Sequence, residues 1–352
     1  MVKDHRIPSG VSEMVSADKT GSSGAPFESI DCRYYGIGGM TIRVSADLPM
    51  MQNTFHPKFK PFEADGPSEE VLSIHHRFGL PDFSRMALGR EVYRRAPWQI
   101  YRTKEGWCYV GVGASQPFIA PSASVMPPAT KATLGNSDPK ALQEAPVYLA
   151  ARFDRDYREG VIYHEDGRAF RLGGHHSLTL FPTDQILLAP ALAERDGCLM
   201  HAAGVVIEGR GFLFVGHSAA GKTTVATLLR DRGTILCDDR IILRRGPDGF
   251  RIFGTWSHGD LPDVSPEDAA LTAIVFLEKS DRERLTPIRD RRKVVRGLLA
   301  CLIRPLPTAR WWDRMLGLTA RISAAVPCYT LYATPHCPVA ELLQNRDETT
   351  VP

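Results

Sequence analysis

Short apolar runs with the spacing of β-strands dominate the first half of the chain. Apolar and polar residues alternate over residues 40–44, as they do in a half-buried strand. Two later runs flank the turn at residues 103–106 and predict a hairpin. We therefore expect residues 33–172 to form mostly strands. The predicted strands are residues 40–44, 98–102, 107–112, 147–153, 160–164 and 169–172.

In the second half, two strand-like runs follow one another with only a tight turn between them. Residues 200–207 and 211–215 are mostly apolar, and a turn that begins Glu208, Gly209, Arg210 joins them, which predicts an antiparallel hairpin. A parallel pair would need a helical crossover at this place. Further strands are predicted at residues 234–237, 240–245, 250–253, 273–277 and 328–332, with a hairpin turn at residues 246–249.

Helix signals are fewer. Thr183 has the chemistry of an N-cap for a helix over residues 184–195, which Pro190 should interrupt. A second helix is predicted directly after residue 224, where apolar residues recur at helical spacing and Gly233 marks the end. These apolar residues are Val225, Ala226, Leu228 and Leu229.

This pattern predicts an α/β protein with a strand-rich N-terminal domain over residues 27–181 and a core with a mixed sheet over residues 182–345. Residues 1–26 are rich in serine, glycine and charge and lack periodicity, so we interpret them as a flexible tail. The segment at residues 120–139 has the composition of a loop.

The composition and net charge of the chain exclude some classes of binding partner. The chain has 352 residues, of which 43% are hydrophobic and 24% charged, as in ordinary globular proteins. A net charge of +3 is too small to indicate a nucleic acid or a membrane surface as partner. No run approaches the ~18 apolar residues that a membrane span needs. The oligomeric state, including a homo-oligomer, stays open.

Cysteines indicate the compartment. The 7 cysteines are scattered and never in C-x-x-C spacing, which is typical of reduced thiols and argues against a zinc site. The N-terminus lacks the apolar core of a signal peptide. We therefore expect a cytoplasmic protein.

One motif stands out between the predicted hairpin and the second helix. Residues 216–224 read G-x-x-x-x-G-K-T-T, which is the pattern of a loop that binds nucleoside triphosphates. Its glycines let backbone N–H groups turn toward phosphate oxygens. A lysine there reaches the β and γ phosphates, and the hydroxyl after it binds Mg²⁺. The predicted ATP-binding residues are Gly216, His217, Ser218, Ala219, Ala220, Gly221, Lys222, Thr223 and Thr224.

An acidic pair follows at the end of the next predicted strand. Asp238 comes 16 residues after Lys222, and Asp239 is next to it. Carboxylates at a strand end beside a phosphate site are where a Mg²⁺ ligand or a general base belongs. Neighbouring side chains on a strand point to opposite faces, so we expect the two aspartates to have different roles.

Together, these features resemble the catalytic domain of HPr kinase/phosphorylase, which shares its nucleotide-binding core with ATP-dependent phosphoenolpyruvate carboxykinase. The resemblance rests on a histidine in the first hairpin strand, the glycine-rich loop, a short helix, a strand and the acidic pair. It implies that Lys222 and Thr223 hold phosphate and Mg²⁺. It also implies that Asp238 is the general base for an acceptor serine and that His201 lies near it. Asp239 would then hold Mg²⁺.

The chain departs from this family at two loop positions. Ala219 stands where the family usually has glycine, and Thr223 where it usually has serine. The stretch with which the family turns over phosphorylated HPr is not recognisable. The chain equally resembles HPr-kinase-like proteins of peptide-tailoring clusters.

Other segments carry weaker signals. The loop at residues 254–260 combines glycines, an aromatic residue, a histidine and a carboxylate, which is typical of functional loops. The histidine pairs at 75–76 and 175–176 cannot easily share one ion, because neighbours on a strand diverge. Residues 282–296 contain seven basic residues, which favour a solvated helix face, with a docking patch as the alternative.

The sequence therefore predicts a Mg²⁺-dependent kinase that transfers the ATP γ-phosphate to a serine hydroxyl of a protein or peptide. Lys222, Asp238 and His201 would be the catalytic residues, and Thr223 and Asp239 the metal ligands. Two alternatives remain: a kinase for a small molecule, such as free serine or a metabolite, and a nucleotide-gated regulatory protein that transfers nothing.

Overall fold

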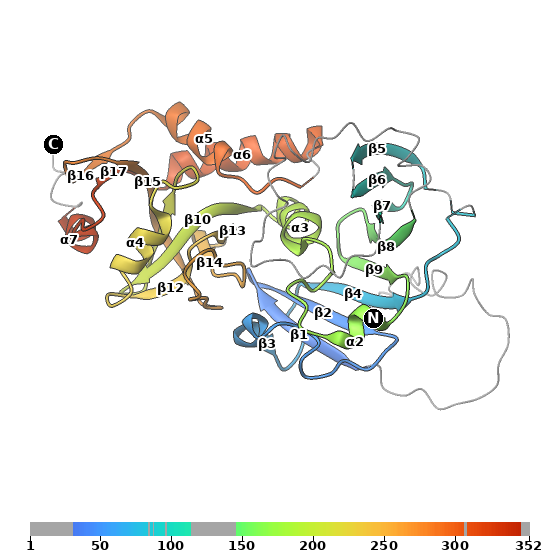
Figure 1. Cartoon of the computed structure of the whole chain (residues 1–352). Helices are drawn as coiled ribbons and strands as arrows, with labels where there is room; N and C mark the ends of the chain where they lie inside the picture. Colours follow the sequence, from blue (N-terminus) through green and yellow to red (C-terminus); the bar gives the residue numbers. More distant parts are fainter. Residues whose placement is uncertain are drawn as a thin grey trace, which may run out of the picture. The chain divides into compact units, whose positions relative to one another are not determined.

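The computed structural model describes residues 31–345, except residues 84, 87, 96, 114–145 and 306–307. The tail predicted over residues 1–26 and the loop predicted over 120–139 lie outside this part. The described residues form a mixed α/β structure with two sheets (Figure 1). Asp31–Pro352 clusters as one compact unit that contains both.

The first sheet has nine strands in the order β3-β1-β2-β4-β9-β8-β7-β6-β5. It is mixed, since β2–β4 and β4–β9 are parallel while the other neighbours are antiparallel. The predicted hairpin is confirmed by the pairing of Arg102 with Trp107. The strands are β1 (Cys32–Ile37), β2 (Met40–Ala46), β3 (Glu63–Ala64), β4 (Val71–Phe78), β5 (Arg90–Arg95), β6 (Trp98–Arg102), β7 (Gly106–Val112), β8 (Val147–Asp154) and β9 (Glu159–His164).

We predicted a strand at residues 169–172, and this prediction is wrong. These residues belong to the helix α2 (Arg168–Leu172). The Asp166 carboxylate accepts a hydrogen bond from the Arg168 N–H at 2.8 Å and so favours a turn at the helix start. Gly173, at φ 72°, ends the helix. A run this short contains one buried anchor, Phe170, and periodicity cannot distinguish a helix from a strand on one anchor.

The second sheet confirms both predicted hairpins, with Ile207 opposite Arg210 and Gly246 opposite Gly249. Its order is β11-β10-β13-β14-β15-β17-β16, and β12 pairs with β10. Because β11 also pairs with β15, the pairings from β11 through β10, β13, β14 and β15 form a closed ring. The strands are β10 (Gly197–Ile207), β11 (Arg210–Val215), β12 (Thr234–Cys237), β13 (Arg240–Gly246), β14 (Gly249–Phe253), β15 (Asp268–Lys279), β16 (Arg284–Pro287) and β17 (Cys328–Ala333).

The helix predicted over residues 184–195 is a π-helical turn, η3 (Asp184–Leu188), followed by the helix α3 (Ala189–Ala193). The Ala189 N–H donates to the Asp184 carbonyl, one residue further back than in an α-helix. The predicted cap is wrong, because the Thr183 hydroxyl contacts Ser177 and Thr179 instead of the helix start.

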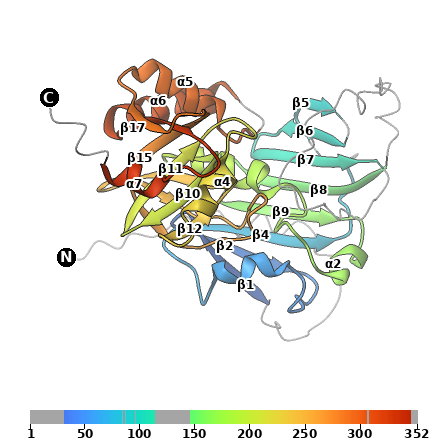
Figure 2. The same ribbon diagram turned by 60° about the vertical axis from the view of Figure 1, so that its left-hand side comes forward.

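The remaining helices belong to the second half, where α5 and α6 lie side by side (Figures 1 and 2). The basic stretch at 282–296 is helical only from Arg291, since its first part forms β16. All seven of its basic side chains are exposed. The helices are α4 (Lys222–Leu228), α5 (Arg291–Ala300), α6 (Ala309–Ala325) and α7 (Val339–Gln344). No helix among the described residues is long and apolar enough to cross a membrane.

Residues around the first sheet pack against the second half. Phe59 and Phe62 of the 3-10 helix η2 (Pro57–Phe62) contact the ring of Trp256, with centroids 5.0 and 5.3 Å apart. The Arg244 guanidinium donates to the Gly38 carbonyl at 2.7 Å. Gly38 has φ +60°, and an added Cβ would meet Ile242 at 2.9 Å. A residue with a Cβ would therefore be strained at this turn between β1 and β2.

Candidate functional site

The glycine-rich loop at residues 216–224 connects β11 to α4, as the motif requires (Figure 2). Val215 ends the buried strand, and His217, Ser218 and Ala219 at the tip of the loop are exposed. The backbone is left-handed at Ala219, with φ 62°, and at Gly221, with φ 103°. An alanine in this conformation is strained, which gives a physical reason to expect glycine at position 219.

Lys222 folds back over this loop. Its Nζ donates to the carbonyls of Gly216 and His217, both at 3.1 Å. Burial lowers the pKa of Lys222, and the attraction of Asp239 opposes this shift only in part. The ammonium group is thus held at the mouth of the loop by two backbone carbonyls.

Asp238 is buried, with 1% of its surface exposed, and both its oxygens accept hydrogen bonds. The Thr223 hydroxyl donates to Oδ2 at 2.8 Å. The Gly259 N–H donates to Oδ1 at 2.6 Å, and the Leu261 N–H to Oδ2 at 3.1 Å. A Cβ on residue 259 would lie 3.1 Å from Asp238 Oδ2, so this close approach of the 254–260 loop depends on glycine.

Asp239 has different neighbours and a more open position, with 17% of its side chain exposed. His201 Nε2 lies 3.0 Å from Oδ1, and Arg240 contacts Oδ2 at 3.0 Å. Burial alone would raise the pKa of Asp239. The hydrogen bond from His201 and the charges of Arg240 and Lys222 outweigh this effect, so the pKa lies below its usual value.

The structure shows which aspartate His201 and Thr223 contact. His201 pairs with Asp239, whereas the resemblance placed it near Asp238. The Thr223 hydroxyl contacts Asp238, and the assignment of Thr223 and Asp239 as Mg²⁺ ligands stays a prediction. The reason is the divergence of neighbouring side chains: Asp238 points toward α4, and Asp239 toward β10, the strand that carries His201.

Sequence reasoning missed other residues of the site. Arg240 contacts Asp239 and also lies 3.8 Å from Asp184. Cys301 lies against the glycine-rich loop: burial raises the pKa of its thiol, while Lys222 and the Gly216 backbone oppose the shift. Cys301 is far from the motif in the chain and has no pattern of its own, so only the fold brings it there.

The donor atoms fit a magnesium ion. The hydroxyl of Thr223 and the carboxylates of Asp238 and Asp239 are hard oxygen ligands, and Mg²⁺ typically uses one or two carboxylates together with phosphate oxygens and water. Among the described residues, no set of three or more histidine, cysteine or acidic side chains has the arrangement of a metal site.

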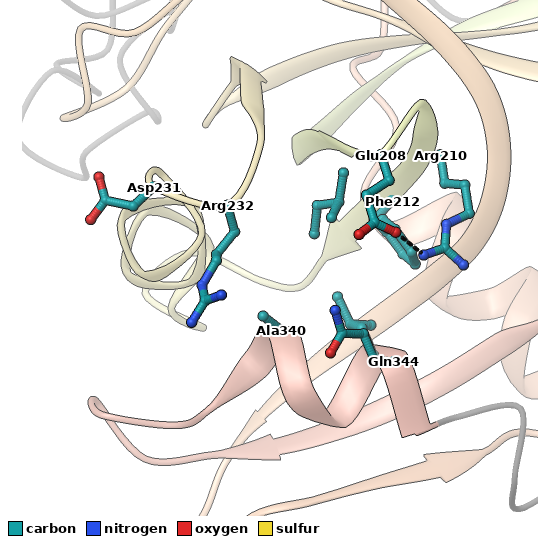
Figure 3. Close-up of a pocket in the computed structure, with 9 residues that line it drawn as sticks. Glu208, Arg210, Phe212, Asp231, Arg232, Ala340 and Gln344 are labelled. Carbon is teal, nitrogen blue, oxygen red and sulfur yellow. Dashed lines mark hydrogen bonds and ion pairs between the residues drawn. The ribbon is translucent and has the colours of Figure 1, made fainter.

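A cavity of about 210 Å³ lies elsewhere, at the opposite end of β11 from the glycine-rich loop (Figure 3). Glu208 and Arg210 form an ion pair on one side of it, and α7 closes another side with Ala340 and Gln344. It contains none of the predicted site residues, so we do not assign it to the phosphate site.

Comparisons with known proteins give limited matches. The model of a family described as SynChlorMet cassette protein ScmC matches residues 184–301, a minority of the chain that includes the glycine-rich loop, both aspartates and His201. No curated protein matches. Among solved structures, the HPr(Ser) kinase/phosphatase from Coxiella burnetii is 16% identical, over 43% of this chain and 97% of that chain, with a TM-score of 0.28. This similarity is too low to establish an activity.

Proposed function

We propose that the protein is a Mg²⁺-dependent kinase that transfers the ATP γ-phosphate to a serine hydroxyl of a protein or peptide. One observation carries the proposal. The mouth of the glycine-rich loop is surrounded by an ammonium group on Lys222, a hydroxyl–carboxylate pair of Thr223 and Asp238, and a histidine–carboxylate pair of His201 and Asp239. Phosphoryl transfer needs cations at the phosphates and an acceptor for the hydroxyl proton.

In this proposal, the Lys222 ammonium leaves the two loop carbonyls and contacts the β and γ phosphates. The loop N–H groups bind the same phosphates. Thr223 and Asp238 would hold Mg²⁺, which neutralises phosphate charge when bound. Because Asp238 already accepts two backbone N–H groups in a buried place, it has little freedom to take a proton.

We therefore assign the role of general base to Asp239, which reverses the assignment implied by the family resemblance. Its carboxylate takes the proton of the acceptor hydroxyl while the serine oxygen bonds to the γ phosphorus and the bond to the ADP oxygen breaks. The Nε2–H of His201 fixes the orientation of this carboxylate, and Arg240 stabilises its negative charge. Both contacts are made by residues outside the glycine-rich loop.

The test is transfer of an isotopically labelled γ-phosphate from ATP to components of a lysate, followed by mass spectrometry of proteins, peptides and small molecules. We expect labelled phosphate on serine in a protein or peptide, and about 10²-fold less of it with an Asp239→Asn variant. Label on a small molecule alone would replace the proposal by a small-molecule kinase. ATP binding without any label transfer would favour a nucleotide-gated regulatory protein.

A further inference from the structure

Four nitrogen-bearing side chains gather beside the proposed site without being part of it. His56 and Lys58 come from the start of η2, His176 from the segment after α2, and His258 from the 254–260 loop. All four are partly buried. We call them the His–Lys cluster.

Backbone pairing holds two of the histidines face to face. Phe55 and His175 form a β-bridge, and the His56 N–H donates to the His175 carbonyl at 2.9 Å. This bridge brings the next residue, His176, onto His56, with the ring centroids 4.0 Å apart and the planes 28° from parallel. The arrangement is therefore fixed by the main chain.

The same contacts leave hydrogen-bond donors at the surface of the cluster. The Nδ1 of His56 accepts from the Lys58 N–H at 3.2 Å. A neutral His56 must therefore carry its proton on Nε2, where it can serve a ligand. In the part of the chain that the structure describes, none of the four side chains forms an ion pair with a carboxylate.

Burial and neighbouring positive charge lower the pKa values of three members of the cluster. Burial lowers the pKa of His56, and the charges of Lys58 and His258 lower it further. Burial and the charges of His56, Lys58 and His258 lower the pKa of His176 to about 4. Burial also lowers the pKa of Lys58, although Asp184 attracts it. A bound anion would stabilise the positive charge of the half-buried Lys58 and accept hydrogen bonds from the neutral imidazoles.

Two connections place the cluster next to the reacting groups. His258 is adjacent to Gly259, whose N–H binds the Asp238 carboxylate. On the other side, Lys58 is attracted to Asp184, which faces Arg240, the partner of Asp239. The cluster thus contacts the aspartates through the 254–260 loop and Arg240, and not through the loop that would hold the ATP phosphates.

We propose that the His–Lys cluster binds a carboxylate of the phosphate acceptor, so that the preferred acceptor is a serine peptide with a carboxylate near the reacting hydroxyl. This inference rests on the proposed kinase function. One ammonium group together with the Nε2–H of a neutral His56 matches the single charge of a carboxylate better than the double charge of a phosphate. The Nδ1–H of a neutral His258 already donates to the Gly259 carbonyl at 2.9 Å. The first half of the chain would supply this selectivity.

The experiment measures both binding and transfer with short serine peptides that have amidated C-termini. In one set an aspartate is placed in turn at each position around the serine, and in the matched set an asparagine replaces it. We expect the best aspartate peptides to bind, in the presence of ADP, about tenfold or more tightly than their asparagine partners. Asparagine peptides with a free C-terminus test whether the cluster binds a C-terminal carboxylate instead of a side-chain carboxylate.

Two variants and a control test whether the preference for aspartate peptides depends on the His–Lys cluster. Lys58→Gln and His176→Gln should reduce the preference for aspartate to near one. Lys60→Gln, in the same 3-10 helix but exposed, should keep it. Equal binding of all sets to the wild-type protein would overturn the inference, as would tighter binding of a matched phosphothreonine set.

The binding measurement separates the two proposals. A preference for carboxylate peptides without any phosphoryl transfer would remove the kinase function and leave the carboxylate subsite standing. Phosphoryl transfer to the aspartate and asparagine sets at equal rates, with equal binding, would leave the kinase function standing and remove the subsite.

Discussion

At the residue scale, the two adjacent aspartates meet different groups, and this difference can be tested. Asp239→Asn keeps the size of the side chain but removes its charge, so it should lower the transfer rate about 10²-fold or more while MgATP still binds. Asp238→Asn would place an amide N–H₂ against the N–H group of either Gly259 or Leu261, because these two donate to different carboxylate oxygens. It should raise the Mg²⁺ concentration needed for half-maximal rate.

Steady-state kinetics at several Mg²⁺ concentrations, with calorimetry of MgATP binding, distinguishes these effects. If Asp239→Asn works at the normal rate and Asp238→Asn does not, the base is Asp238, as the family resemblance implied.

A second residue-scale prediction concerns the left-handed Ala219. Its φ of 62° costs about 1–2 kcal/mol for a residue with a Cβ, and glycine would remove most of this strain. Against this, glycine makes the unfolded chain more flexible by about 0.4–1 kcal/mol. Ala219→Gly should therefore raise the free energy of unfolding by up to about 1 kcal/mol in denaturant titrations.

The matched control is Ala220→Gly, one residue further on. Ala220 is buried in an apolar cluster and is not among the residues with a positive φ, so glycine there should destabilise the protein. Stabilisation by both variants, or by neither, would contradict the strain at Ala219.

At the element scale, sequence patterns predicted strands best where apolar residues and turn residues agreed. The hairpin of β10 and β11 and the strand β12 begin and end within a few residues of their predicted positions, because Gly209 and Gly233 mark their ends. β15 is longer than predicted at both ends, because Ala269 and Ala270 pair with β14, and Glu278 and Lys279 pair with β17.

Some residues of the candidate site could be predicted from the sequence, and others could not. Lys222 and Thr223 belong to a local motif and could be predicted from the sequence. The partners of the aspartates could not, because Gly259 and His201 come from distant segments that only the sheet brings together. A single sequence contains the residue types but not the register that decides which aspartate meets which partner.

An element-scale prediction follows from the histidines that join β4 and β9. The Nε2 of His76 donates to the Leu178 carbonyl at 3.0 Å, so its Nδ1 must accept from His164 Nε2 at 2.9 Å. Burial lowers the pKa of His164 to about 4, and that of His76 well below its usual value. In the unfolded chain both titrate near pH 6.5.

Because the unfolded state takes up these protons first, the contribution of this pair to the free energy of unfolding should be constant above about pH 6.5 and fall as the pH approaches 4. His164 alone contributes a loss of about 3 kcal/mol over this range. His164→Gln can still donate to His76 but cannot be protonated, so its stability should fall less steeply in urea titrations across this pH range. An unchanged slope would contradict the neutral pair.

At the scale of the whole molecule, the two sheets share one core cluster. Leu199, Ile242 and Trp256 from the second half pack in the same cluster as residues of the first sheet. Trp256 is 1% exposed and lies directly before Ser257 and His258 in the 254–260 loop. The stability of the first half of the chain and the position of the 254–260 loop beside Asp238 should therefore depend on each other.

We therefore expect the described part of the chain to unfold in one thermal transition, and Trp256→Ala to lower it. Loss of a buried tryptophan costs about 3–5 kcal/mol, which corresponds to a decrease of several degrees in the transition temperature for a protein of this size. The Trp256→Ala variant should also transfer phosphate more slowly at temperatures at which it is still folded, because the 254–260 loop loses the anchor that holds Gly259 against Asp238. Trp312→Ala, on α6 away from this cluster, should lower the transition temperature without that loss. Two separate transitions in calorimetry, with only one shifted by Trp256→Ala, would show that the halves fold independently and that the loop does not depend on the first sheet.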